Sequence, residues 1–368
     1  MNAHLTPVIA GFIPLLDSSV LVVAAEKGFA AQEGIELKLI RETSWANIRD
    51  RIVVGHFDVA HMLAPMPIAA TLNLTSLSTS MFAPMLLGLG GNAITVATAL
   101  WREMTAFEPD RLGEPASTGR ALAELIRARR EEGKPLLRFG VVHPFSCHAY
   151  ELRYWLAAAG IDPERDVDIS VLAPQVMADA LAAGQLDGYC VGEPWNTSAV
   201  LAGTGRIVTY KQAIWPNSPE KVLGVTEKWA NTNPDTLAAL LRALSNAADW
   251  CADPDNTEAL ATLLARPEYL NCELEVCLPA LTGEMQLDQN LFVNVRDFVS
   301  FSGGLSAAPR SAHGKWLFGQ MVRWGQAEKS DEASASVERV YSSQLYCDAL
   351  ELSELQDDDS IQLFDGSH

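Results

Sequence analysis

Short apolar strands alternate with helices along much of the chain, and this alternation restricts the fold more than any other sequence feature. Ile35–Ile40 alternates apolar and polar residues as a half-buried strand does, and Trp45–Val54 has the spacing of a short amphipathic helix. Phe57–Ala60 is predicted to form the next strand. Strands that alternate with helices are typical of an α/β protein with a largely parallel sheet.

The same alternation is predicted further along the chain. The other expected strands are Leu5–Leu16 (leading into a loop), Ala93–Ala97, Leu137–Val142, Val167–Leu172, Gly188–Val191 and Ile207–Val208. The expected helices are one that starts at Asp17–Ser19 and runs through Phe29, then Arg120–Arg130, Ala149–Ala159, Pro174–Ala183, Asp235–Trp250, Thr257–Leu264 and His313–Gly325. Asp110–Ser117 is predicted to be a loop. The pattern indicates two α/β lobes followed by a helical C-terminal part.

The charge of the chain limits its partners. There are 27 Lys and Arg residues against 46 Asp and Glu residues, a formal net charge of -19. Such a charge repels phosphate backbones and anionic lipid, so we expect no direct nucleic-acid and no membrane partner. Asp348–His368 contains seven acids and no Lys or Arg. Two interpretations of this acidic tail stay open: a solvated terminus, or a segment that binds a basic partner.

The first residues and the cysteines favour a cytoplasmic location. The first cation is Lys27, and Gly11 and Pro14 interrupt the apolar start, which is unlike a secretory signal. No run is long enough to span a bilayer. The six cysteines have no CxxC spacing, so reduced thiols are expected. Cys272 and Cys277 are interpreted as packing residues rather than zinc ligands.

The motifs of the common enzyme classes are missing. The sequence has no GxSxG, no Walker loop, no strand-linked glycine fingerprint and no HExxH, which predicts a protein that is not an enzyme. Gly88–Gly91 is interpreted as a turn at a strand end. His56, Asp58 and His61 lie close in sequence. On a strand, His56 and Asp58 would share one face and His61 would lie on the other, so a structural or hydrogen-bonded role is favoured over a metal site.

Five residues at or just past predicted strand ends form the candidate site, because ligands of α/β lobes bind there. They are Trp45, Asn92, His148, Gly192 (in the run Gly192–Trp195) and Lys221. Each one taken alone is explained by packing or solvation. Together they offer a cation, a titratable donor, an amide and a flat aromatic surface, which suits a small planar oxyanion.

Several segments resemble the nitrate- and bicarbonate-binding solute receptors of ABC transporters. The segments are SWANIRDRI (Ser44–Ile52), FDVAHMLAPMP (Phe57–Pro67), RYWLAAAGIDP (Arg153–Pro163), PQVMADAL (Pro174–Leu181), DGYCVGEPWN (Asp187–Asn196), PEKVLGVTEKW (Pro219–Trp229) and PRSAHGKWLFGQMVRWG (Pro309–Gly325). The resemblance implies a two-lobed periplasmic-binding-protein-like (type II) fold with the ligand cleft between the lobes. We expect lobe 1 to comprise residues 1–98 and 212–345, lobe 2 residues 99–211, and an acidic tail residues 346–368.

The resemblance also assigns ligand-binding positions. The family's tryptophan falls on Trp45, its polar residue after a Gly-rich strand end on Asn92, its histidine on His148, its motif glycine on Gly192 and its lysine on Lys221. Bicarbonate-type members have an acid in place of the lysine and recruit calcium. Lys221 and His148 therefore imply nitrate or nitrite as ligand, with no metal and no cofactor. Nitrate accepts hydrogen bonds in its plane, which Lys221, His148 and Asn92 can donate.

With no export signal recognised, the chain resembles the NasS-type cytoplasmic nitrate/nitrite sensors within this family. Such sensors hold an RNA-binding antiterminator of the NasT type while ligand is absent, and release it to control nitrate assimilation genes. The alternative is a nitrate/nitrite (or bicarbonate) substrate-binding component of an ABC transporter. An enzyme on the same fold, such as the pyrimidine synthase of thiamine biosynthesis, uses a cysteine-rich motif, whereas Cys190 stands alone here.

Overall fold

The computed structural model describes residues 5–109, 111–353 and 364–365. The chain forms two compact units, and each is assembled from three separate stretches. Unit 1 contains Met1–Leu89, Pro219–Asn271 and Ser300–Ser360. Unit 2 contains Gly90–Ser218, Cys272–Val299 and Ile361–His368.

Unit 1 is built on a six-stranded sheet with the order β13-β4-β10-β3-β1-β2. β1 pairs in parallel with β2 and β3, whereas β10 lies antiparallel between β3 and β4. Every residue of β3 is buried, which places this strand in the middle of the core. The strands are β1 (Thr6–Phe12), β2 (Ile35–Arg41), β3 (Val59–Leu63), β4 (Met81–Gly90), β10 (Pro219–Thr226) and β13 (Val299–Ser300).

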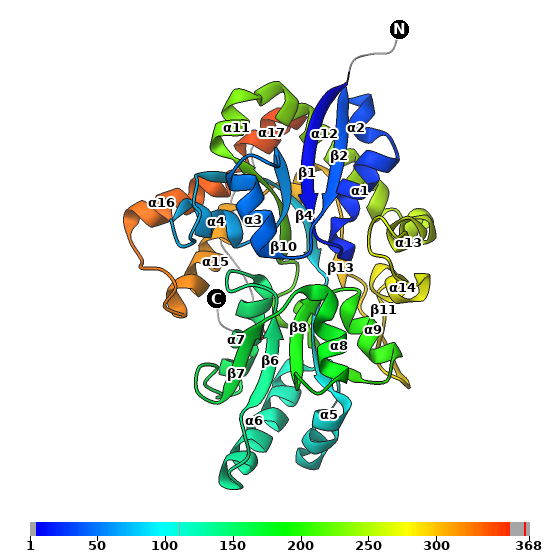
Figure 1. Cartoon of the computed structure of the whole chain (residues 1–368), viewed down its shortest axis with the longest axis vertical. Coiled ribbons are helices and arrows are strands. Elements are labelled where there is room, and N and C mark those ends of the chain that lie inside the picture. Colours follow the sequence, from blue (N-terminus) through cyan, green and yellow to red (C-terminus); the bar gives the residue numbers. More distant parts are fainter. Residues whose placement is uncertain (1–4, 110, 354–363, 366–368) are drawn as a thin grey trace. The chain divides into compact units, whose positions relative to one another are not determined.

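Helices pack against the strands of unit 1 (Figure 1). α1 and α12 contact each other and β2, while α3 contacts β1, β3 and β10. α3 begins at Trp45 because the Ser44 hydroxyl accepts a hydrogen bond from the Asn47 amide at 3.2 Å. The helices are α1 (Ser19–Glu26), α2 (Phe29–Gln32), α3 (Trp45–Val53), α4 (Met66–Thr71), α11 (Glu227–Thr232), α12 (Pro234–Ala252), α13 (Thr257–Ala265), α15 (Ser311–Arg323), α16 (Asp331–Val340) and α17 (Gln344–Leu350).

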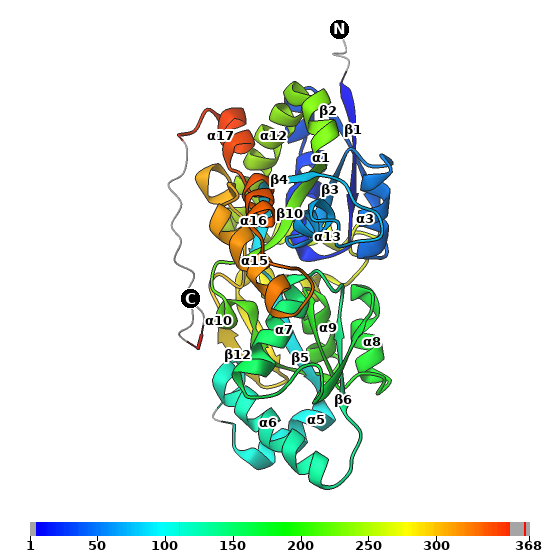
Figure 2. The same ribbon diagram turned by 90° about the vertical axis from the view of Figure 1, so that its left-hand side faces the viewer.

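Unit 2 has a five-stranded sheet with the order β7-β6-β8-β5-β9 and a separate hairpin of β11 and β12. β6 pairs in parallel with β7 and β8, and β5 is antiparallel to β8 and β9. Figures 1 and 2 show α5 and α6 side by side. The strands are β5 (Asn92–Ala97), β6 (Leu137–Val141), β7 (Val167–Val171), β8 (Gly188–Gly192), β9 (Gly205–Tyr210), β11 (Glu284–Asp288) and β12 (Leu291–Asn294). The helices are α5 (Thr98–Met104), α6 (Pro115–Glu131), α7 (Cys147–Ala158), α8 (Met177–Ala182), α9 (Trp195–Leu201), α10 (Lys211–Ile214) and α14 (Leu274–Thr282).

The α/β class is confirmed, but two local predictions were wrong. Both sheets are mixed rather than largely parallel, because β10 and β5 each run antiparallel to their neighbours. The loop expected over Asp110–Ser117 ends early, because Pro115 starts α6 and the Glu114 carboxylate accepts hydrogen bonds from two amides of its first turn. After Ile207–Val208 helices predominate, as expected, but β10 and the β11–β12 hairpin, which were not predicted, lie among them.

The division into units differs in detail from the expected ranges. Residues 92–97 form β5 in the sheet of unit 2, and the segment 272–299 belongs there because α14 and β11 pack on α9. The tail expected at 346–368 begins within α17, where Tyr346 is buried and its hydroxyl contacts Ser245 Oγ at 3.1 Å. Phe364 and Asp365 contact Tyr154 of unit 2. The acids Glu354 and Asp357–Asp359 lie outside the described residues.

Among the residues that the structure describes, no helix combines the length and the apolar character that crossing a lipid bilayer requires.

Gly90 gives a test of close packing in unit 2. Its φ is +72°, and a Cβ there would lie 2.3 Å from the Phe298 carbonyl oxygen, a backbone atom. Gly28 has a similar φ of +80° but nothing within 4 Å of a Cβ. We expect Gly28→Ala to cost about 1 kcal/mol of unfolding free energy from the left-handed conformation alone. Gly90→Ala should cost at least about 2 kcal/mol, measured by urea unfolding, and equal losses would contradict the contact.

Candidate functional site

A buried lysine forms the centre of the polar cluster in unit 1. Lys221 lies in β10, next to two irregularities in the β10–β4 register, which alter how a strand aims its side chains. Its Nζ is 2.6 Å from Asp17 Oδ2 and 2.9 Å from Glu220 Oε1, and all three side chains are buried. Asp17 comes from the short 3-10 helix Leu16–Ser18, before α1. The lysine charge is therefore already neutralised by carboxyl groups of its own unit.

His61 and Trp45 complete this cluster. His61 lies in β3, and its Nε2 is 3.0 Å from Asp17 Oδ1. The Trp45 ring lies 5.3 Å from the His61 ring between centroids, and Lys221 Nζ lies 5.5 Å from the Trp45 ring centroid. Trp45 Nε1 is buried and has no hydrogen-bond partner among the described residues. The indole N–H is thus a buried donor beside the lysine.

The charges in this cluster follow from its burial. Burial by itself would raise the pKa of Asp17, but Lys221 and then His61 hold it below the usual value. Burial lowers the pKa of His61, and Asp17 offsets only part of this effect. Burial would also lower the pKa of Lys221, but Asp17 and Glu220 keep it above its usual range. At neutral pH the cluster holds an ammonium, an Asp17 carboxylate and a neutral imidazole.

A second polar cluster lies in unit 2, at the ends of β5 and β8. Asn92 opens β5 and is the ladder partner of Gly192, the last residue of β8. Asn92 Nδ2 donates to Glu151 Oε2 at 3.0 Å, and Lys211 forms an ion pair with Glu151 Oε1. All of these side chains are buried, so the ion pair is shielded from water.

His148 belongs to the same cluster through its helix. It is the second residue of α7, is fully buried, and precedes Glu151 by one helical turn. α7 begins there because the Ser146 hydroxyl accepts a hydrogen bond from the Ala149 amide at 3.0 Å. The Ser146 cap, rather than the apolar periodicity, therefore places His148 in the first turn of α7.

Glu193 follows Gly192 and is an unusually buried acid. Its Oε2 accepts a hydrogen bond from the Thr197 amide at 3.1 Å, and Oε1 has no partner among the described residues. Burial raises the pKa of Glu193 to about 7, and hydrogen bonds from Thr197 and Asn196 oppose the rise. This carboxyl group therefore titrates near neutral pH.

The structure brings the predicted residues together in two groups. Trp45 and Lys221 lie together in unit 1, and Asn92, Gly192 and His148 belong to unit 2. The sequence analysis missed the carboxyl and ammonium groups that pair with them: Asp17, Glu220, Glu151 and Lys211. A usable signal was present, since Glu151 is an acid in the largely apolar helix AYELRYWLAAA.

The interpretation of His56, Asp58 and His61 can also be compared with the structure. His61 contacts Asp17, and Asp58 Oδ2 accepts a hydrogen bond from the Ile9 amide at 2.8 Å, whereas His56 is exposed. His61 and Asp58 thus have the hydrogen-bonded role that the sequence favoured.

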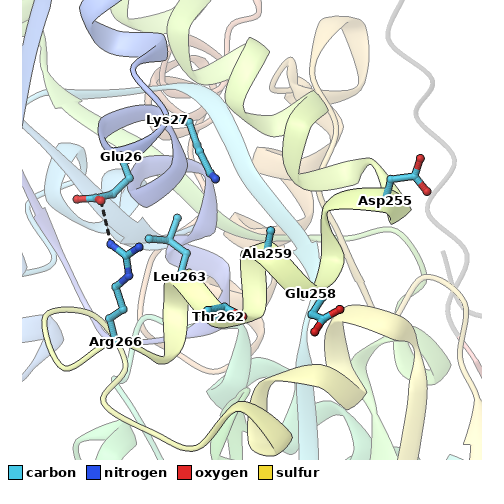
Figure 3. A pocket seen from close by; sticks show the side chains of 8 residues that line it. All are labelled: Glu26, Lys27, Asp255, Glu258, Ala259, Thr262, Leu263 and Arg266. Carbon is cyan, nitrogen blue, oxygen red and sulfur yellow. Dashed lines mark hydrogen bonds and ion pairs between the residues drawn. The ribbon is translucent and has the colours of Figure 1, made fainter.

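Unit 1 also carries a surface pocket of about 520 Å³ (Figure 3). Both cations that line it already have partners: Arg266 pairs with Glu26 at 3.2 Å, and Lys27 Nζ lies 4.8 Å from the Trp250 ring centroid. No predicted site residue lines this pocket, whose walls are Glu26, Lys27, Asp255, Glu258, Ala259, Thr262, Leu263 and Arg266. We assign it no part in the anion site.

Comparison with known proteins identifies the family. Residues 2–265 match the NMT1-like family. The chain belongs to the NMT1-like family. It is 31% identical over 348 residues to the nitrate/nitrite binding protein NrtA of Synechococcus elongatus, covering 92% of this chain and 76% of that protein. The relationship to solute-binding proteins that the sequence segments implied is therefore confirmed.

The chain is also similar to transport ATP-binding proteins and to a solved structure. The chain is 34% identical over 364 residues to the bicarbonate transport ATP-binding protein CmpC of Synechococcus elongatus, covering 97% of this chain and 52% of that protein. It spans about half the length of the nitrate and bicarbonate ATP-binding relatives. The crystal structure of the periplasmic nitrate-binding protein NrtA from Synechocystis PCC 6803 matches with a TM-score of 0.89 and 26% identity, covering 99% of this chain and 95% of that one. The two-domain periplasmic-binding-protein fold is thus confirmed.

Glu193 predicts a pH dependence of stability. Because its folded pKa of about 7 lies above the unfolded value of 4.5, its favourable contribution is complete below pH 4.5 and is lost as the pH rises through 7. The loss amounts to roughly 3 kcal/mol, from 1.36 kcal/mol per pKa unit. Glu193→Gln should remove this fall in unfolding free energy between pH 5 and pH 8, measured by urea unfolding. The exposed Glu36→Gln should keep the wild-type slope, and two identical slopes would contradict the pKa of Glu193.

Proposed function

We propose that this protein is a substrate-binding protein for nitrate or nitrite. The observation that carries the proposal is its similarity to the nitrate/nitrite binding protein NrtA over nearly the whole chain. The relatives compared above are named as binding or transport proteins, which supports a role in binding rather than catalysis. The proposed ligand-binding residues are Trp45 and Lys221 of unit 1 and Asn92, His148 and Gly192 of unit 2.

The proposed role of Trp45 follows from its unsatisfied donor. Nitrate and nitrite offer only acceptor oxygens, so each contact requires an N–H or O–H from the protein. Trp45 Nε1 is buried, has no partner among the described residues and belongs to a ring 5.5 Å from Lys221 Nζ. Leaving a buried donor unpaired costs about 1–3 kcal/mol, and an anion that accepts its hydrogen bond recovers this cost.

Lys221 can donate fewer hydrogen bonds to a bound anion than its charge suggests. Asp17 and Glu220 already contact Nζ, so an anion has to share the ammonium with carboxyl groups. An ammonium has three N–H donors, and two of them point to these partners. We infer that Lys221 contributes at most one hydrogen bond, and that it chiefly offsets the repulsion between a bound anion and Asp17.

The same carboxyl groups favour bicarbonate as the second candidate ligand. Bicarbonate carries an O–H that donates to a carboxylate, whereas nitrate and nitrite carry none. Asp17 and Glu220 are both buried beside Lys221, which supplies acceptors for such a donor. The similarity to the bicarbonate transport protein CmpC supports this candidate as well.

Calorimetric titration with nitrate, nitrite and bicarbonate tests both candidates. We expect nitrate or nitrite to bind, and Trp45→Phe to weaken binding about tenfold or more, because it removes one hydrogen bond to an anion while keeping the ring. Lys221→Glu is a less informative variant, since it places a third carboxyl group among buried acids.

Trp155→Phe is the matched control for this experiment. Trp155 is buried in unit 2, and its Nε1 donates to the Pro115 carbonyl at 2.8 Å. The substitution should lower stability by about 1 kcal/mol and leave the nitrate Kd unchanged. Unaltered affinity of Trp45→Phe would exclude the indole as a ligand, and tight binding of bicarbonate alone would favour the second candidate.

A finer role as a NasS-type cytoplasmic sensor stays a prediction from the sequence resemblance. If it holds, the ligand-free protein should form a complex with a NasT-type antiterminator, and nitrate should dissociate it, because a ligand shifts a protein between states that it binds unequally. Size-exclusion chromatography of the mixed proteins with and without nitrate measures this. A mixture that never forms a complex would leave the transport-receptor role as the supported one.

A further inference from the structure

Two thiols of unit 2 lie in contact at the start of α14. Cys272 Sγ and Cys277 Sγ are 3.3 Å apart, and the thiol of one donates a hydrogen bond to the other. Cys272 is partly exposed, whereas Cys277 is fully buried on the fourth residue of α14. The other four cysteines, Cys147, Cys190, Cys251 and Cys347, are buried and unbonded to sulfur. One thiol of this pair is thus open to solvent with a second thiol directly behind it.

The environment distinguishes the two thiols chemically. The hydrogen bond between the two sulfurs lowers the pKa of Cys272, against opposing effects of burial and of Glu273. The same bond, together with burial, raises the pKa of Cys277 far above its usual range. Cys272 also lies just before the first turn of α14, where the helix dipole favours an anion. The partly exposed sulfur is therefore the nucleophile and the buried one its partner.

We propose that Cys272 and Cys277 form a reversible dithiol–disulfide pair that reacts with hydroperoxides. The Cys272 thiolate attacks the terminal oxygen of the hydroperoxide, so that an S–O bond forms and the O–O bond breaks. The other oxygen leaves as hydroxide from hydrogen peroxide, or as an alkoxide from an alkyl hydroperoxide. The Cys277 sulfur then attacks the sulfenic acid, so that an S–S bond forms and the S–O bond breaks. Water leaves with the Cys277 proton, and the hydroperoxide has accepted two electrons.

The geometry requires only a small movement for the second step. A disulfide has an S–S length of about 2.05 Å, so the sulfurs have to approach by roughly 1.2 Å. Cys272 lies at a bend before α14, whereas Cys277 is held within the helix. α14 packs on α9, whose first residue Trp195 closely follows Gly192 and Glu193. Oxidation would thus fix the segment that supports this loop of unit 2.

Peptide mapping of the full chain tests the proposal directly. The reduced protein is treated with an equimolar amount of hydrogen peroxide at pH 7, blocked with iodoacetamide, and digested with a protease that cleaves after glutamate. Glu273 and Glu275 lie between the two cysteines, so cleavage separates Cys272 from Cys277 unless a disulfide joins them. We expect the two peptides to be linked, two hydrogens lighter than their sum, and released by dithiothreitol.

Three variants assign the roles of the two sulfurs. Cys277→Ser should leave a sulfenic acid on Cys272 that a cyclic diketone traps, because the second thiol is missing. Cys272→Ser should react with hydrogen peroxide at least about tenfold more slowly than wild type, since the remaining thiols are buried and buried thiols react slowly. The control Cys251→Ser, in α12 of unit 1, should behave as wild type. The peptide mapping uses the wild-type chain, so its result does not depend on whether the variants fold.

Other outcomes would overturn the pair. One such outcome is that Cys272 stays a thiol after peroxide treatment, and another is that it is oxidised to sulfinic acid with no linked peptide. Either outcome would show that Cys277 does not form a disulfide with it. Linkage between other cysteines would show that the reaction follows unfolding. Because the readout is the state of the sulfurs, failure of the nitrate titration leaves this result unaffected, and the reverse also holds.

Discussion

The buried contact between Lys221 and Asp17 is the interaction on which unit 1 depends. It joins β10, which follows unit 2 in the chain, to the short helix that follows β1, and Asp17 also contacts His61 of β3. Removing one member of a buried ion pair leaves an unpaired charge and costs several kcal/mol, whereas the intact pair adds little net stability. The pair therefore specifies which strands meet in this sheet more than it strengthens the sheet.

Unit 2 also contains a buried ion pair, formed by different residues. Glu151 of α7 pairs with Lys211 of α10 and accepts a hydrogen bond from Asn92 of β5, so a helix and a strand end are held by one carboxylate. In both units a predicted ligand-binding side chain contacts a buried charge that is already paired. Such an arrangement holds side chains in place before ligand arrives, which limits the entropy lost on binding. At the proposed anion site of this acidic protein, the nearby cations Lys221 and Lys211 are buried and locally paired.

Local sequence patterns were sufficient to predict individual helices and their ends. α12 and α13 begin and end within two residues of the expected Asp235–Trp250 and Thr257–Leu264, because apolar periodicity and end signals lie within each segment. β10 was missed because its continuous burial leaves no alternation to recognise. The candidate positions follow from strand ends and family segments, but the partners Asp17 and Glu151 depend on register between segments far apart in the chain. No local pattern contains that information. The contact between Cys272 and Cys277 was also missed, since their spacing matches no common motif.

The order of segments has a practical consequence for anyone who dissects the molecule. The chain enters unit 2 at Gly90, leaves it at Ser218, and enters it again at Cys272. No single cut in the gene therefore yields either unit alone, because any fragment that contains all of one unit also contains part of the other. An isolated unit 1 would need its three stretches rejoined by new linkers, or a circularly permuted gene. A stop codon just before Leu274 should accordingly damage both units, because it removes α14 and the β11–β12 hairpin from unit 2 and α15–α17 from unit 1.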